Sequence, residues 1–485
     1  MSELPKENNG MSKVDVGSAG LTESVAMGRN STLPAAVIAM TSFLVTFDIT
    51  AVVVAMPRIK EELHLDVAGF AWVMDAYSIA FVAMLMAAGV LADRYGRRKA
   101  LLFGNLVFAL ASLACGMAQS DVSLWAARAA QGLGAAFVIC GGLSLMSDHY
   151  HEQQRRVKAF ALAGTVTGAA MALGPSVGGL VADLLGWRWV FLVNLPVCLL
   201  IAIVLPWVTH ESRDSNARRI DVAGVATLSL SLLSLIWLLL HGPVVGGVEV
   251  SYPIALGAVF VFFGAFVASQ KLQRQPMMNF SLFADRSFLG ICLVPLALSI
   301  AYWSLLVYLP LFLHQGLGQP LGYTSLLMLT ATLPMLLLPF VGARIAARMA
   351  IRNFFSLGLG VVSAGVAMIA GAAATGSLPL ALVGMALSGA GTAVLNAQVS
   401  GVIVSMAPRD RAGTVSAIAT VLRQGGFAVG IALLGALLKS QQASPWTSNV
   451  SQPFALIFVV AAACGLVASL FVFALVRPAA QNITA

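Results

Sequence analysis

The sequence predicts an all-α, polytopic membrane protein with 14 transmembrane helices, arranged as six, two and six. Hydrophobic residues make up 59% of the 485 residues and charged residues only 10%, whereas a soluble protein carries about 25% charged residues. Long apolar runs also follow one another along almost the whole chain, and none alternates as a barrel strand does. Lipid must therefore be the solvent for most of the surface.

The number of spans comes from the lengths of these runs. A bilayer-spanning helix needs about 20 mostly apolar residues. Fourteen runs qualify, at residues 34–56, 70–91, 100–118, 123–146, 159–182, 189–208, 221–241, 252–270, 288–313, 322–342, 354–373, 378–405, 413–438 and 454–476. The eleventh and twelfth runs are the least clearly divided, because only Gly376, Ser377 and Pro379 separate them.

These runs predict a division of the chain into bundles and tails. The first residues are polar and lack the apolar stretch and cleavage site of a signal peptide. We expect a disordered cytoplasmic tail (1–33), an N-terminal six-helix bundle (34–208), a two-helix insertion with its flanking loops (209–287), a C-terminal six-helix bundle (288–476) and a cytoplasmic tail (477–485).

The basic residues predict the orientation. With the N-terminus in the cytoplasm, 22 of the 28 Lys and Arg residues lie on the cytoplasmic side, four lie on the other side, and Arg128 and Arg423 lie within spans. This asymmetry follows the positive-inside rule. The formal charge of +8 is therefore a topology signal and does not indicate nucleic-acid binding. We expect a multi-pass protein of the inner membrane with both termini in the cytoplasm.

Several function classes are disfavoured. No loop exceeds about 17 residues and no GxxxxGK[ST] motif is present, which argues against a nucleotide-binding domain. The five cysteines lie in apolar runs without metal-ligand spacing. We expect no catalytic residues, metal or cofactor, and hence no enzyme. The proton motive force would be the energy source, and a monomer the functional unit.

The loop after the second span carries the first motif, GVLADRYGRRKALL. Its defining residues are Gly89, Asp93, Arg94, Gly96, Arg97 and Arg98. The glycines permit a tight turn and close helix approach, and Asp93 can accept hydrogen bonds from Arg97. The alternative is that the basic residues only anchor the topology. The loop after the tenth span, VGARIAARMAIRN, is similar, which indicates a parallel repeat of spans 1–6 in spans 9–14.

Two acids and one arginine lie inside apolar runs of the N-terminal half. A carboxylate in hydrocarbon costs a few kcal/mol at least, so Asp48 and Asp75 are expected to take up protons or find partners. Arg128 shares a helix face with Gln131 and needs an acid, for which Asp48 and Asp75 are the candidates. We expect Asp75 to be the main proton or cation site. The alternative for all three charged residues is a structural helix-pairing role.

The fifth span is rich in glycine. Its motif consists of Gly164, Gly168, Gly174, Pro175, Gly178 and Gly179. The four-residue spacing creates a groove for close helix packing, and Pro175 removes a backbone hydrogen bond. In span thirteen, Arg423 and Gln424 have no acid in the spans of their own half. Arg423 could pair with an acid of the N-terminal half, bind an anionic substrate group, or face cytoplasmic water.

Together these motifs resemble the major facilitator superfamily, and within it the fourteen-helix drug:proton antiporters. The resemblance extends from Ala35 to Val476. It implies the major facilitator fold, a cytoplasmic gate at the first motif, proton transfer at Arg128, and an antiporter signature at Gly174 and Pro175. In this family an acid in the second helix is typical of exporters of quaternary ammonium compounds.

The expected function is therefore proton-coupled export of small amphipathic or cationic compounds, as in multidrug or biocide efflux. The absence of acids from spans nine to fourteen argues against a multi-proton or dication mechanism. One alternative is a dedicated exporter of a single metabolite, antibiotic or siderophore. An alternative of another class is a membrane sensor or scaffold that transports nothing.

Overall fold

A computed structural model describes residues 32–150, 152–213, 221–241, 244–245, 248–249, 251–273, 280–406, 412–442 and 452–477. The predicted tail 1–33 lies outside this part except for its last two residues, and the predicted tail 477–485 except for its first. The described chain is almost entirely helical. The exception is a two-residue antiparallel pairing of β1 (Val244–Val245) with β2 (Val248–Glu249).

The first group of helices contains the first six predicted spans. They are α2 (Leu33–Glu62), α3 (Val67–Tyr95), α4 (Arg97–Gly116), α5 (Asp121–His149), α6 (Gln153–Leu184) and the short α7 (Arg188–Leu192) followed by α8 (Asn194–Val208). Within this group α4 packs on α5, α2 on α6, and α3 on α5. We call the end where α2 begins the Leu33 end and the opposite end the Glu62 end.

Two helices follow, α9 (Val222–His241) and α10 (Tyr252–Leu272), which pack on each other. The last group begins with η1 (Phe280–Ala284), α11 (Arg286–Leu298), η2 (Ser299–Trp303), α12 (Ser304–Leu311) and η3 (Phe312–Gly316). It ends with α17 (Ile351–Thr375), α18 (Leu378–Ser405), α19 (Ala412–Gln442) and α20 (Gln452–Leu475). The predicted division of runs eleven and twelve is confirmed: Gly376 ends α17 with a left-handed φ of 67°.

The tenth predicted run is the exception to regular helical geometry. It forms four short consecutive helices, α13 (Leu321–Leu327), α14 (Leu329–Thr332), α15 (Pro334–Leu337) and α16 (Pro339–Ala346). Pro334 and Pro339 have no backbone N–H, which explains two of the three interruptions. In the described part of the chain, 13 helices are long and apolar enough to cross a membrane, so the count of fourteen stays a prediction.

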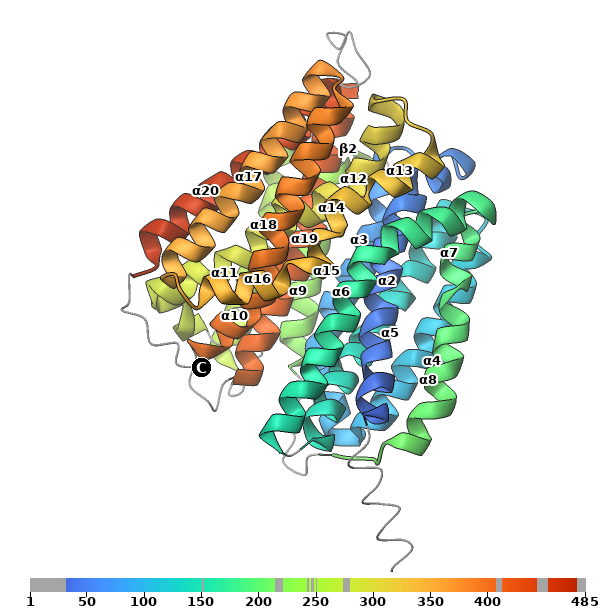
Figure 1. The fold of residues 1–485 in the computed structure, drawn as a ribbon, viewed down its shortest axis with the longest axis vertical. Helices are drawn as coiled ribbons and strands as arrows, with labels where there is room; N and C mark the ends of the chain where they lie inside the picture. Colours follow the sequence, from blue (N-terminus) through green and yellow to red (C-terminus); the bar gives the residue numbers. More distant parts are fainter. Residues whose placement is uncertain are drawn as a thin grey trace, which may run out of the picture.

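The two large groups lie side by side (Figure 1), and their internal packing is similar. The contact of α3 with α5 recurs as that of α14, α15 and α16 with α18, and that of α4 with α5 recurs as α17 with α18. Between the groups, the second span (α3) packs on the thirteenth (α19), and the fifth span (α6) packs on the tenth (α13, α14 and α15). If spans 1–6 repeat in spans 9–14, these two contacts are equivalent. These pairs agree with the expected parallel repeat. The domain limits themselves stay a prediction.

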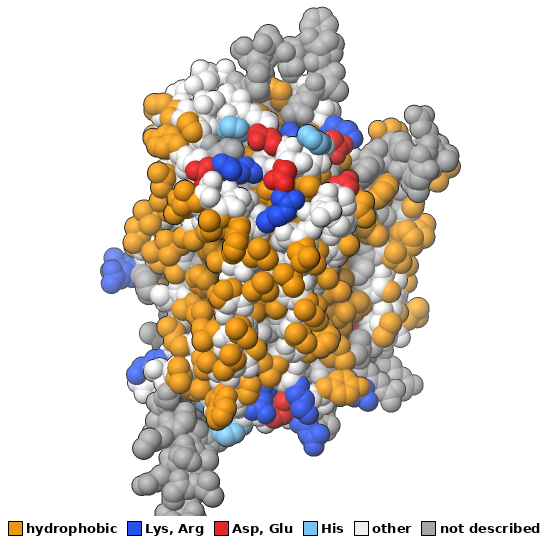
Figure 2. Space-filling model, turned by 90° about the vertical axis from the view of Figure 1, so that its right-hand side faces the viewer, with side chains coloured by type: hydrophobic (Ala, Val, Ile, Leu, Met, Phe, Trp, Pro, Cys, Tyr) orange, Lys and Arg blue, Asp and Glu red, His pale blue; other side chains and the backbone are white. Residues whose placement is uncertain are grey.

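Apolar residues are distributed unequally between the two ends. One core runs through the last group and continues into the first group at the Glu62 end, through residues 51–56 and 70–74. The Leu33 end of the first group, with Ile38, Phe81, Leu145 and their neighbours, forms a second core, to which α19 of the last group adds Ile418 and Val421. The space-filling view shows a broad apolar band between charged side chains at both ends (Figure 2). A band of this kind is the surface that lipid would cover.

Candidate functional site

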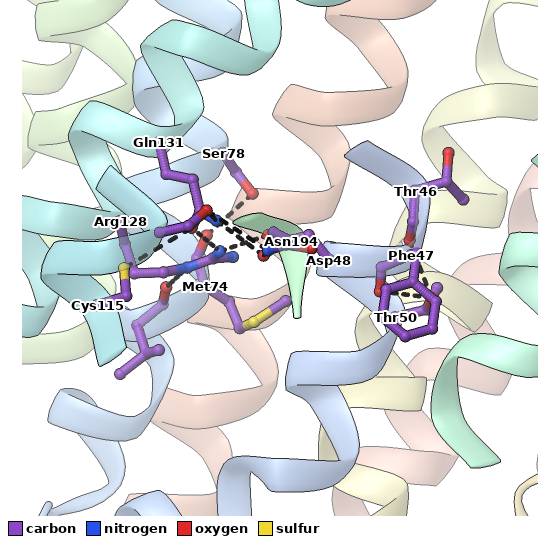
Figure 3. Close-up of polar contacts among 12 residues, drawn as sticks. Thr46, Phe47, Asp48, Thr50, Met74, Ser78, Cys115, Arg128, Gln131 and Asn194 are labelled. Atoms are coloured by element: carbon purple, nitrogen blue, oxygen red, sulfur yellow. Dashed lines mark hydrogen bonds and ion pairs between the residues drawn. The ribbon is translucent and has the colours of Figure 1, made fainter. Parts of the chain in front are cut away.

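A buried polar network joins four helices of the first group (Figure 3). Asp48 on α2 and Arg128 on α5 are fully buried, and Arg128 Nη1 lies 2.7 Å from Asp48 Oδ2. The other oxygen of Asp48 accepts hydrogen bonds from Gln131 Nε2 at 2.8 Å and from Asn194 Nδ2 at 2.7 Å. Gln131 Nε2 also donates to Ser112 Oγ on α4 at 2.8 Å. The carboxylate of Asp48 is therefore neutralised and well hydrogen-bonded.

Arg128 is held from three sides. Its Nε donates to the carbonyl oxygen of Val73 at 3.1 Å, and its Nη1 donates to Gln131 Oε1 at 2.6 Å. Its guanidinium lies 4.4 Å from the centre of the Tyr77 ring, a favourable cation–π geometry. A Cβ on Gly132 would lie 2.2 Å from the Tyr77 carbonyl oxygen. Only glycine permits α5 to come this close to α3, so Gly132 helps to place Arg128.

Asp75 has a different environment. Its side chain is fully buried, and neither carboxyl oxygen has a hydrogen-bond partner within the described chain. Ala71, one turn earlier on α3, lies near Gly435 of α19, and Asp75 shares that face of the helix. Tyr308 on α12 packs against Phe70 of α3, with the ring centres 5.6 Å apart. Asp75 therefore lies where the two groups of helices meet, roughly 12 Å inside the Glu62 end of α3.

The structure distinguishes the two candidate partners of Arg128, because Asp48 pairs with it and Asp75 does not. Two members of the network, Ser112 and Asn194, were not expected from the sequence. A single amide in the apolar run 189–208 was a signal for Asn194. Ser112 could not be found in this way, because serine is common in membrane helices and gives no comparable signal.

Two adjoining cavities lie between the groups of helices. One has a volume of about 240 Å³ and the other about 550 Å³. Both are lined from α2, α5, α6 and α19, at the middle of these helices and toward the Leu33 end. Ser42, Leu143, Thr167, Met171 and Arg423 contact both cavities. Asp48, Asp75 and Arg128 are not among the lining residues.

The side of α2 that carries Asp48 is turned away from these cavities. Thr46 and Thr50 line the smaller cavity from the other side of the helix, as Figure 3 shows. Of the group Tyr77, Trp237, Tyr302, Trp303, Tyr308 and Met328, only Trp303 is among the described lining residues. The others pack elsewhere in the protein.

The glycine motif of α6 serves both ends of the molecule. Toward the Leu33 end, Gly164 and Gly168 line the larger cavity, and nothing lies within 4 Å of a Cβ built on Gly164. Toward the Glu62 end, a Cβ on Gly178 would lie 2.5 Å from Ala51 of α2. One on Gly179 would lie 1.8 Å from Ser325 Oγ of α13. The second part of the motif therefore permits close packing, and the first part leaves space.

The motif between α3 and α4 makes its described contacts within the first group of helices. Arg97 donates to Asp93 at 3.0 Å and to Asp148 on α5 at 2.8 Å. Arg98 donates to the carbonyl oxygen of Thr209 at 2.7 Å, and Gly96 adopts a φ of 120° that suits glycine. The expected close helix approach at Gly89 is not seen in this conformation, because no atom lies within 4 Å of a Cβ built there.

The Glu62 end carries contacts between the groups. Lys439 Nζ of α19 lies 4.0 Å from Asp66 Oδ2, and His314 Nε2 lies 3.6 Å from Glu61 Oε1. Hydrogen bonds also cross from α6 to the broken helix: Ser176 Oγ donates to the Ser325 carbonyl oxygen at 3.2 Å. Thr332 Oγ1 donates to the carbonyl oxygen of Ala172 at 3.0 Å. The groups are therefore closed against each other at this end.

The sequence is similar to a known protein family and to individual proteins with names. The family model of the Major Facilitator Superfamily matches residues 38–431 and again 291–484. The multidrug resistance protein Stp of Mycobacterium tuberculosis is 31% identical over 412 residues, covering 85% of this chain and 75% of that protein. The methylenomycin A resistance protein of Streptomyces coelicolor is 30% identical over 454 residues, covering 92% and 94% of the two chains.

A solved structure shows the same fold at much lower sequence identity. The crystal structure of a D-xylose–proton symporter superimposes with a TM-score of 0.67 and 14% identity, and the match covers 92% of this chain and 97% of that one. This similarity concerns the arrangement of the helices alone.

Proposed function

The chain belongs to the major facilitator superfamily, and on that basis we propose that it exports small amphipathic molecules from the cytoplasm in exchange for protons. It is a transport protein rather than an enzyme. Relatives that are named for multidrug resistance and for drug efflux support export as the direction of transport. The Leu33 end would face the cytoplasm, as the distribution of Lys and Arg indicates.

The observation that carries the proton-coupled part of this proposal is the environment of Asp75. A carboxyl group without a hydrogen-bonding or charged partner in a dry interior is stable only in its neutral, protonated form. Asp75 lies in the contact of α3 with α19, so this contact must open before a proton can enter or leave. Proton transfer would therefore be tied to the movement of the two groups of helices.

Asp48 and Arg128 would have a supporting role. Their charges are mutually neutralised and hydrogen-bonded inside the first group, away from the cavities. Such a pair holds α2, α4, α5 and α8 together as one moving body, and it keeps α3 in place through the Val73 carbonyl oxygen. Transport would then proceed by rocking of two rigid groups about the central cavity, with each monomer working alone.

The proton motive force is sufficient for this work. One proton that moves down about 100 mV and about one pH unit releases about 3.7 kcal/mol. This free energy supports roughly a 500-fold gradient of a neutral substrate. No cofactor is needed in the proposed cycle.

The substitution Asp75→Asn tests the proposal in proteoliposomes that contain the purified chain. With an imposed pH gradient and a proton-sensitive dye, the native protein is expected to concentrate an amphipathic fluorophore while protons move the opposite way. Asp75→Asn should abolish this gradient-driven accumulation and retain substrate exchange without a gradient. Asp121→Asn is the matched control, since Asp121 lies in the first turn of α5, away from the interior. Gradient-driven accumulation that survives in Asp75→Asn would refute the coupling role.

A dedicated exporter is the second candidate, because one relative is named for resistance to a single compound, methylenomycin A. A panel of structurally unrelated amphipathic compounds distinguishes the two. Competition among many of them for transport indicates multidrug export, and competition by only one chemical type indicates a dedicated exporter.

A further inference from the structure

The central cavities contain one unusual residue, Arg423. It lies in the first half of α19 and is half-buried. Its side chain lines both the smaller and the larger cavity. It makes no hydrogen bond or ion pair with any residue in the described part of the chain. The intramembrane arginine of the first group, Arg128, has an acid, two other hydrogen-bond acceptors and an aromatic ring as partners.

The charge of the cavities follows from this residue. Among the described residues that line them, Arg423 is the only charged one, and the rest are apolar side chains, hydroxyls and amides. Neither buried acid of the first group compensates for it. Asp48 faces the other side of α2 and is paired, and Asp75 lies on the Glu62 side of the cavities. The cavities therefore present a net positive charge in a region of low dielectric constant, where it attracts anions strongly.

We propose that the cavity between the two groups binds amphipathic molecules that carry an anionic group, and that Arg423 contacts this group. This inference rests on the proposed export function and narrows its substrate class. Met171, Trp303 and Phe427 provide apolar surface for the body of such a molecule. Gln424 lies on the same cavity, and its side-chain amide can donate further hydrogen bonds to an oxygen-rich head group.

The same charge disfavours the cationic compounds that were expected from Asp75. A cation in this cavity would lie near Arg423 without a carboxylate in the described lining to compensate. The charge balance of transport also changes. One proton entering and one monoanion leaving both move positive charge inward, so the membrane potential assists both steps. Exchange of a proton for a monocation would be electroneutral.

A binding experiment with three probes of equal shape tests the inference. They are 4-phenylbutyrate, its neutral amide 4-phenylbutyramide and the cation 4-phenylbutylamine. Radiolabelled 4-phenylbutyrate is bound to the purified full-length chain in a scintillation-proximity assay, and the three unlabelled compounds compete. The acid should compete at about tenfold lower concentration than the amide, as expected for one charge-assisted contact, and the amine should be the weakest.

Three variants identify the residue responsible. Arg423→Gln should remove the difference between acid and amide, and Arg423→Lys should retain part of it. Arg348→Gln removes the same charge from an exposed position at the Leu33 end, and it should behave as the native chain. Three results would overturn the inference: competition by the amine as strong as by the acid, an unchanged preference in Arg423→Gln, or no saturable binding of the acid to the native chain.

A parallel transport assay separates this inference from the proposed function. If the acid binds through Arg423 but the native chain moves none of the three probes under a pH gradient, the binding site stands and the export proposal fails. If the amine is accumulated under the gradient and the acid does not bind, export stands and the inference on Arg423 fails.

Discussion

The Glu62 end and the Leu33 end of this protein differ in how the two groups of helices meet. At the Glu62 end a continuous apolar core, the Lys439–Asp66 ion pair, the His314–Glu61 contact and two hydrogen bonds join the groups. Toward the Leu33 end, cavities of about 240 and 550 Å³ lie between the groups, and a smaller apolar core joins α19 to the first group. In the proposed rocking mechanism, the contacts at the Glu62 end must therefore break, and the cavities toward the Leu33 end must collapse, before the protein can open at the Glu62 end.

The same difference is seen within the glycine motif of α6, and between the two intramembrane arginines, Arg128 and Arg423. Close packing and paired charges lie on the Glu62 side, whereas open space and an unpaired charge lie toward the Leu33 end. The closely packed part of the protein and the proposed substrate site thus lie at different depths of the membrane. The same type of substitution should then change the free energy of unfolding by different amounts at the two depths.

The arginines give the largest expected contrast. Arg128→Gln leaves the Asp48 carboxylate buried without its cation, so we expect a loss of about 3–5 kcal/mol in the free energy of unfolding. Arg423→Gln removes a charge that has no partner in the described chain, and it should leave stability unchanged or raise it. Thermal unfolding in detergent measures both. Equal destabilisation by the two substitutions would show that Arg423 has a structural partner.

The glycines of α6 give an intermediate contrast. In Gly178→Ala the new methyl group meets Ala51 at 2.5 Å, so α2 and α6 must separate, at a cost of about 1–3 kcal/mol. Gly164→Ala places the same group where no atom lies within 4 Å, and its unfolding temperature should equal that of the native chain. The comparison fails if Gly164→Ala is the more destabilising variant.

The charged contacts at the Glu62 end give the smallest effect. Lys439→Gln removes a contact of 4.0 Å between partly exposed groups, so the loss of stability should stay below about 1 kcal/mol. The difference from the native chain should vanish at high ionic strength, because salt screens exposed charges. Unfolding curves at low and high salt provide the test, and a difference that persists at high salt would indicate a buried role for Lys439.

Much of the fold could be predicted from the sequence, because lipid dictates the length of an apolar helix and the distribution of basic residues. The sixth and eleventh runs, 189–208 and 354–373, for example, correspond to the helical segments Arg188–Val208 and Ile351–Thr375. The faces that the helices turn toward each other could not be predicted. Membrane helices are apolar on all sides, so the direction of Asp75 depends on contacts such as that of Ala71 with Gly435, far apart in the sequence.

The partners of Asp48 also could not be predicted from the sequence alone. The sequence predicts two candidate partners for Arg128, Asp48 and Asp75. Which of them forms the ion pair depends on how α2 and α3 are rotated about their axes. Gly132 sets the approach of α5 to α3, and Asn194 reaches Asp48 from α8. No periodic pattern records such contacts. In the sequence, only Pro334 and Pro339 indicate the interruptions of the tenth run.

Those breaks have a mechanical consequence. An uninterrupted helix transmits a tilt along its whole length, whereas interruptions at Met328, Leu333 and Leu338 make bending easier at each of these residues. Met335 and Pro339 lie in the cavity wall, and Ser325 lies in the contact with α6. The cavity wall can thus change shape while the contact of Ser325 with α6 stays in place, which would allow the proposed site to admit molecules of different sizes.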